Sequence, residues 1–69
     1  MNIVVNGEKV TLEKEVNIKE LLNILNVKMQ EYVTVQLNER IIPRKDFENV
    51  KIKENDVIEF LYYMGGGSL

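Results

Sequence analysis

The chain has 69 residues, a net charge of −2 and a hydrophobic fraction of 45%, so it forms one small domain whose stability must come from its apolar core. It contains no cysteine and no histidine, which excludes disulfides, thiolate metal sites, cysteine nucleophiles and histidine bases. The N-terminus lacks a signal-peptide pattern, no block of like charge suggests nucleic acid or membrane partners, and no apolar run approaches the roughly 18 residues that cross a bilayer. We therefore expect a cytoplasmic protein.

The first 13 residues are typical of a β-hairpin. Residues 2–5, "NIVV", favour a strand, and Asn6-Gly7 favours a tight turn because both residues readily adopt positive φ. In 9–13, "KVTLE", apolar and polar residues alternate with the period of a half-buried strand.

An amphipathic helix is predicted to begin after Asn17. The Asn17 side chain can cap the helix, and Glu20 can complete a capping box. Val16 and Leu21 occupy the positions of a hydrophobic staple. The apolar face has helical spacing and consists of Ile18, Leu21, Leu22 and Leu25, and Asn26 is the expected end.

The second half of the chain favours strands joined by turns. Strands are expected at 32–37 and 57–64, a short turn and strand at 47–52, and turns at 38–39 and 53–56. Pro43 disfavours a central strand around it because proline lacks the N–H donor.

The order ββαβ(β)β predicts an α+β fold, a mixed sheet of four or five strands with one main helix on one face. The first and last strands are expected side by side at the sheet centre, as in the ubiquitin-like β-grasp. Residues 1–64 would form this domain and 65–69 a flexible glycine-rich tail. The expected core is Ile3, Val5, Val10, Leu12, Ile18, Leu21, Leu22, Leu25, Val33, Val35, Leu37, Ile58 and Phe60.

A conventional active site is hard to assemble from these side chains, so we expect no enzyme activity and no bound cofactor or metal. The acid pairs Glu13/Glu15 and Glu54/Asp56 lie in turns or on polar faces, where solvated charge is the usual role. The tyrosines are expected to be half-buried strand residues. The basic cluster around Pro43 is expected to be a solvated loop.

The C-terminal sequence "GGGSL" offers a different chemistry. Glycines resist ordering, lack side chains and can enter a narrow tunnel in another protein. An ATP-dependent partner could convert a terminal carboxylate into an acyl-adenylate, which a sulfur or amine nucleophile would then attack. The alternative is a flexible linker, which has the same composition.

The chain resembles the bacterial sulfur carriers of the ThiS/MoaD family, and the thiamine-pathway branch most closely. The resemblance rests on the order and spacing of four segments: "MNIVVNGEKV" (1–10), "NIKELLNIL" (17–25), "VTVQLNERIIPR" (33–44) and "ENDVIEFLYYMGGG" (54–67).

The resemblance implies a sulfur carrier that is a monomer when free. A ubiquitin-activating-type adenylyltransferase, using ATP and Mg, would adenylate the terminal glycine, and sulfur drawn from cysteine would convert it to a thiocarboxylate. Thiazole synthase would then take that sulfur for the thiazole ring of thiamine. Alternatives are sulfur carriage to molybdopterin or cysteine, a ubiquitin-like protein modifier, or a binding module with a linker tail.

Members of this type end at the glycines, whereas this chain continues with Ser68 and Leu69. With these two residues present, the carboxyl of Gly67 is an amide and cannot be adenylated. Either a peptidase removes them, or they are not native, or the chain has another use. Gly67 is the expected working terminus, with Gly66 as the alternative.

Alternation along the last strand predicts a partner surface beside the tail. If Ile58 and Phe60 face the core, Leu61 and Tyr63 point to the other face and share it with Val4. This apolar patch would dock both partners and lead into Gly65. Glu59 and Arg44 are expected at its rim.

Overall fold

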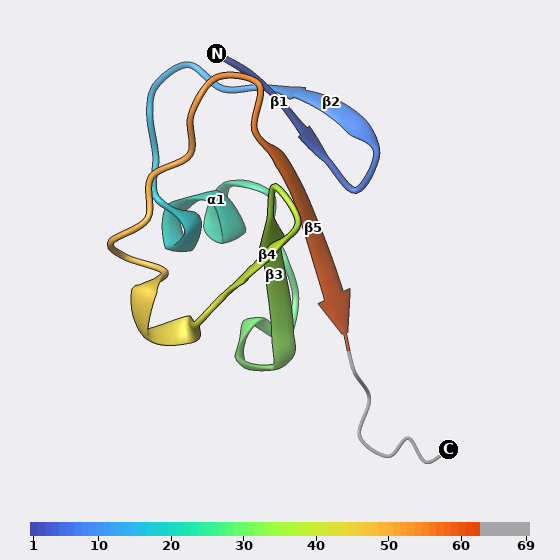
Figure 1. Ribbon diagram of the computed structural model, residues 1–69, viewed down its shortest axis with the longest axis vertical. Coiled ribbons are helices and arrows are strands. Elements are labelled where there is room, and N and C mark those ends of the chain that lie inside the picture. The colour runs from blue at the N-terminus through green and yellow to red at the C-terminus, as the bar shows by residue number, and fades with distance from the viewer. Residues whose placement is uncertain (63–69) are drawn as a thin grey trace.

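The computed structural model describes residues 1–62. They form a five-stranded sheet in the order β2-β1-β5-β3-β4, with one α-helix (Figure 1). The elements are β1 (Asn2–Val5), β2 (Glu8–Thr11), α1 (Ile18–Ile24), the short 3₁₀ helix η1 (Gln30–Tyr32), β3 (Val33–Leu37), β4 (Arg40–Ile42), the 3₁₀ helix η2 (Arg44–Asp46) and β5 (Val57–Tyr62). The predicted ubiquitin-like β-grasp is confirmed. β1 and β5 are parallel neighbours, and the other strand pairs are antiparallel.

Two tight turns close the hairpins at the positions that the sequence indicated. Asn6 and Gly7 have φ values of 52° and 82°, and Asn38 and Glu39 have φ values of 51° and 72°. Positive φ at both central residues matches the right-handed twist of the flanking strands. The Asn38 side chain also bonds to the start of β5, where its Oδ1 accepts from the Val57 amide at 2.9 Å.

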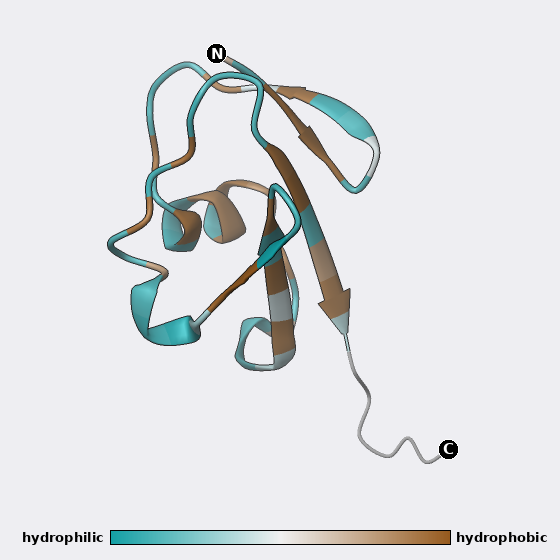
Figure 2. Cartoon of the chain, in the orientation of Figure 1, coloured by the Kyte–Doolittle hydropathy of each residue, from teal (hydrophilic) through white to brown (hydrophobic). Residues whose placement is uncertain are grey.

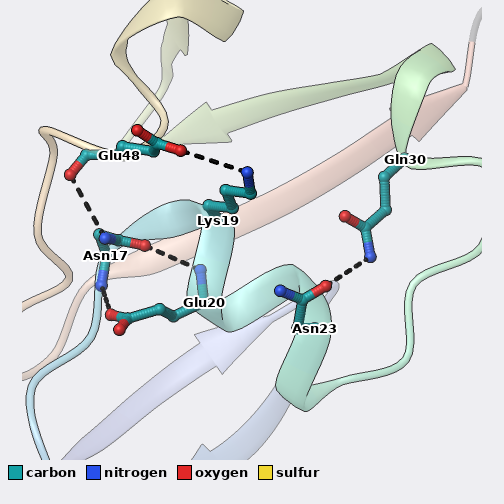
Figure 3. A network of polar contacts seen from close by, with 6 residues as sticks. All are labelled: Asn17, Lys19, Glu20, Asn23, Gln30 and Glu48. Atoms are coloured by element: carbon teal, nitrogen blue, oxygen red, sulfur yellow. Dashed lines mark hydrogen bonds and ion pairs between the residues drawn. The ribbon is translucent and has the colours of Figure 1, made fainter.

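The predicted helix start is confirmed in atomic detail (Figure 3). Asn17 Oδ1 accepts from the Glu20 amide at 2.8 Å, and Glu20 Oε1 accepts from the Asn17 amide at 2.8 Å. These bonds satisfy two donors at a helix end that would otherwise lack partners. After α1, Asn26 takes the left-handed conformation with φ 56°, which ends the helix as expected.

The core lies between α1 and one face of the sheet. Figure 2 shows hydrophobic colour along the central strands and hydrophilic colour in most of the connections. Nine of the predicted core residues are buried: Ile3, Val5, Leu12, Ile18, Leu21, Leu22, Val33, Val35 and Ile58. Val10, Leu25, Leu37 and Phe60 are only partly buried and pack against the edge of this core. Val16, Phe47 and Ile52 are buried and were missing from the predicted core.

The strand expected within 47–52 is wrong. The chain makes η2 and a turn, followed by a single bridge between Lys51 and Asn17. The Ile52 amide donates to Val16 O at 2.8 Å, and the Ile18 amide donates to Val50 O at 3.2 Å. The segment is therefore held to the start of α1 rather than to the sheet, and this contact buries Ile52.

Smaller differences concern the strand limits and the tyrosines. β2 ends at Thr11 and β3 begins at Val33, so Tyr32 falls in η1. Tyr32 and Tyr62 are exposed, at 62% and 42%, and not half-buried as expected. Tyr63, the rest of the predicted last strand and the predicted tail lie outside the described residues.

Within residues 1–62, no helix has the length and hydrophobicity that a membrane span requires.

Candidate functional site

The end of β5 determines where the C-terminal glycines leave the sheet. β3 pairs with β5 from Leu37↔Ile58 to Val33↔Tyr62, whereas β1 pairs with β5 only at Val57 and Ile58. The last part of β5 is therefore held by β3 on one side. The predicted site residues Tyr63, Gly65, Gly66 and Gly67 follow this point and lie outside the described residues.

The Asn6 side chain extends the contact between the β1 side of the sheet and β5. Asn6 Oδ1 accepts from the Phe60 amide at 2.9 Å, two residues beyond the last β1–β5 pair. The left-handed backbone of Asn6 turns the chain away from β5 at this point, so its side chain takes the place of a further strand residue.

The sheet face opposite α1 carries the predicted patch residues of the described chain. The register aligns Val4 with Val57, Leu61 with Thr34, and Glu59 with Gln36. Paired residues point to the same face, so Val4, Glu59 and Leu61 share the face opposite the buried Ile58. Val4 and Leu61 are half-buried and Glu59 is exposed.

Sequence reasoning missed two residues of this face. Ile41 is paired with Gln36 and is 61% exposed, and Val57 is paired with Val4 and is 44% exposed. Alternation in the last strand could have indicated Val57. The position of Ile41 on this face could not be predicted, because it depends on the register of β3 with β4. We call Val4, Ile41, Val57 and Leu61 the open-face patch.

Arg44 lies elsewhere than expected. It lines a hollow with Lys19, Leu22 and Phe47, on the side of the sheet that α1 covers. Its guanidinium donates to two backbone carbonyls, those of Gln30 at 2.6 Å and Val33 at 2.9 Å. The structure therefore separates Arg44 from Glu59, which lies on the open face.

The acidic side chains of the 53–56 turn have structural partners. Both oxygens of Glu54 accept from the Asn2 amide at 3.2 Å. Asp56 accepts from the Lys53 amide at 2.7 Å and from the Asn38 side chain at 3.0 Å. Across residues 1–62, no group of three or more candidate ligands is placed to hold a metal ion.

The sequence matches the ThiS family over residues 2–67. The fold matches a crystal structure of a thiamine biosynthesis protein (ThiS) from Geobacter metallireducens with a TM-score of 0.90 and 45% identity, covering 97% of this chain and 100% of that one. A solution structure of a thiamine biosynthesis protein from the same organism matches with a TM-score of 0.78 and 45% identity, covering 100% of this chain and 91% of that one.

Two curated relatives are similar over nearly the whole chain. A thiazole synthase of Paramagnetospirillum magneticum is 31% identical over 99% of this chain, which spans only 21% of that enzyme's length. The uncharacterized protein ycf40 of Pyropia yezoensis is 31% identical over 97% of this chain and 93% of its own length.

Proposed function

Because the chain belongs to the ThiS family, we propose that it is a sulfur carrier of thiamine biosynthesis that acts through a C-terminal glycine thiocarboxylate. The observation that supports this proposal most directly is the family match, which extends from residue 2 through the glycines to Gly67. The protein is then a substrate of other enzymes and not a catalyst.

The proposed chemistry needs no catalytic side chain on the carrier. A terminal carboxylate is a poor electrophile, and reaction with ATP in an adenylating enzyme would convert it to an acyl-adenylate with release of pyrophosphate. Hydrosulfide would then attack the acyl carbon and displace AMP, and loss of its proton would leave the thiocarboxylate. ATP and Mg would be bound by the activating enzyme.

We place the working terminus at Gly67, where the family match ends. The carboxyl of Gly67 must be free for adenylation, so Ser68 and Leu69 have to be absent from the active form. A peptidase that trims them is one source of that form.

Thiazole synthase is the proposed sulfur acceptor. A thiazole synthase carries a segment similar to this whole chain within its own, much longer sequence. A carrier and its acceptor enzyme must meet during sulfur transfer, and their presence in one polypeptide is a reason to pair them here.

The open-face patch is the proposed docking surface for both enzymes. It combines partly exposed apolar side chains from β1, β4 and β5, with Glu59 beside them. Glu59 lies between Val57 and Leu61, and Gln36 lies between Ile41 and β5. Exposed apolar residues with polar neighbours on an open sheet face are typical of partner surfaces. β5 contributes two of the four residues and leads directly into the glycines, so docking here would direct them toward an active site.

The test is the intact mass of a chain ending at Gly67 after incubation with the activating enzyme, ATP and a sulfur source. Replacement of one oxygen by one sulfur is the expected result. Conjugates of higher mass would instead indicate a protein modifier, and an unchanged mass would reject both. The same reaction on the 69-residue chain is the control, and its mass should not change because Gly67 is blocked.

A further inference from the structure

The turn before β3 has few local contacts of its own. η1 has only three residues, no side chain caps its start, and Met29 before it has the left-handed φ of 54°. The Tyr32 amide donates to Met29 O at 2.9 Å. Short 3₁₀ turns have poor hydrogen-bond geometry, so other contacts must fix this one.

Arg44 supplies two of those contacts from a distant part of the chain. Nη1 donates to Gln30 O at 2.6 Å and Nη2 donates to Val33 O at 2.9 Å, so one guanidinium bonds to the first residue of η1 and to the first residue of β3. The guanidinium lies 5.2 Å from the centroid of the Phe47 ring, and Phe47 is buried. The planar fork of arginine suits two acceptors at once, whereas lysine offers a single charged atom.

Two further side chains hold the same segment. The side-chain Nε2 of Gln30 donates to Asn23 Oδ1 at 3.1 Å and to Val27 O at 3.2 Å, and Figure 3 shows the side chain reaching from η1 toward α1. From the other side, the Tyr62 hydroxyl donates to Lys28 O at 2.7 Å. The segment before β3 is thus tied to α1, η2 and β5.

These contacts converge on the last described pair of the sheet. Val33, whose carbonyl Arg44 holds, is the register partner of Tyr62. On the other side of β5, the strand pairs with β1 end at Ile58, and the Asn6 side chain reaches only to the Phe60 amide. The direction in which β5 leaves the sheet therefore depends on the position of Val33.

We propose that Arg44 and Tyr62 are positioning residues that together fix the direction in which the C-terminal segment leaves β5. This inference rests on the proposed function, because direction matters only if the glycines must enter a partner's active site. A displacement of about 1 Å at a reacting group can lower a rate by up to about a hundredfold. Arg44 would then affect the reaction without touching either partner.

The structural test uses ¹⁵N relaxation of the full chain with Arg44→Ala, and Lys45→Ala as the control. Lys45 has the same charge and lies in the same 3₁₀ helix, but its side chain makes no hydrogen bond within residues 1–62. We expect lower order parameters for the Leu61 and Tyr62 amides in Arg44→Ala alone, with Ile58 unchanged. Equal order parameters in the two variants would overturn the proposal.

The functional test measures adenylation of chains ending at Gly67 at varied carrier concentration. Arg44→Ala should lower kcat about tenfold with KM little changed, because the open-face patch is intact. Arg44→Lys should recover part of the loss, and Lys45→Ala should match the unsubstituted chain. A raised KM with unchanged kcat would show that Arg44 contacts the enzyme and would overturn the positioning role.

Tyr62→Phe keeps the test decisive if Arg44→Ala fails to fold. It removes only the hydroxyl bond to Lys28 and should lower kcat in the same direction by a smaller factor. An unchanged kcat together with unchanged Leu61 relaxation would reject the proposal. If the unsubstituted chain is not adenylated, the proposed function fails, while the relaxation experiment still decides whether these residues fix the end of β5.

Discussion

The side chain of Asn6 accepts a hydrogen bond from the backbone amide of Phe60 at 2.9 Å, across 54 positions of sequence. The same residue has φ 52° and forms the β1–β2 turn with Gly7. One residue thus shapes a local turn and extends the support of the central strand. These two roles can be separated by substitution.

Asn6→Gly keeps the positive φ and removes the acceptor, so it should cost about 0.5–1 kcal/mol of the free energy of unfolding. Asn6→Ala also removes the acceptor and places a Cβ in the left-handed region, which should add about 1 kcal/mol. Urea unfolding of both variants measures the difference. Equal losses would show that the turn tolerates alanine.

Asn17→Ala should cost about 1 kcal/mol of stability because it removes the acceptor for the Glu20 amide at the start of α1. Glu20→Gln is the matched control. Its side-chain oxygen can still accept from the Asn17 amide, so its midpoint in urea should stay close to that of the unsubstituted chain. A large loss in the control would mean that the charge of Glu20 matters more than the cap.

Leu21→Ala should cost about 2–5 kcal/mol, because Leu21 is 0% exposed at the centre of the helix–sheet contact. Leu25→Ala should cost less, because Leu25 is only partly buried at the end of α1. In so small a domain, the first variant should lose much of its stability. Thermal and urea unfolding of the two chains would contradict this packing if the Leu25 variant proved the less stable.

Leu61→Glu should leave the fold intact and weaken binding to the activating enzyme and to thiazole synthase by about tenfold or more, since it places a charge in the open-face patch. Ile24→Glu makes the same change at an apolar residue of α1 that is 52% exposed, outside the patch. Calorimetry should give native affinity for the control. Native affinity for Leu61→Glu would remove the patch from the proposed mechanism.

Gly66→Ala, in a chain ending at Gly67, should fold normally and be adenylated slowly, because a methyl group obstructs a tunnel shaped for glycine. Circular dichroism checks the fold, and the rate of pyrophosphate release checks the activation. The unsubstituted chain ending at Gly67 is the reference. Equal rates for the two chains would show that the tunnel accepts a side chain at this position.

The preferences of neighbouring residues were enough to predict the turns, the start of the helix and the central strands from the sequence. Asn6-Gly7 and Asn38-Glu39 adopt positive φ, and Asn17 caps α1, because these preferences involve residues within a few positions of one another. Alternation of apolar residues likewise placed Val33, Val35 and Ile58 in the core. The chemistry proposed for the C-terminal glycines also starts from the sequence, because it rests on their composition and position.

Only the tertiary structure decided what depends on distant partners. The path of 47–52 follows its hydrogen bonds to the start of α1, which bury Ile52 against a segment more than thirty positions earlier. The register of β3 with β4 brings Ile41 to the open face. Arg44 turns to the helix side because two carbonyls and the Phe47 ring accept its guanidinium there. Such contacts leave no periodic pattern in the sequence, because they depend on how the elements pack together and not on the residues beside them.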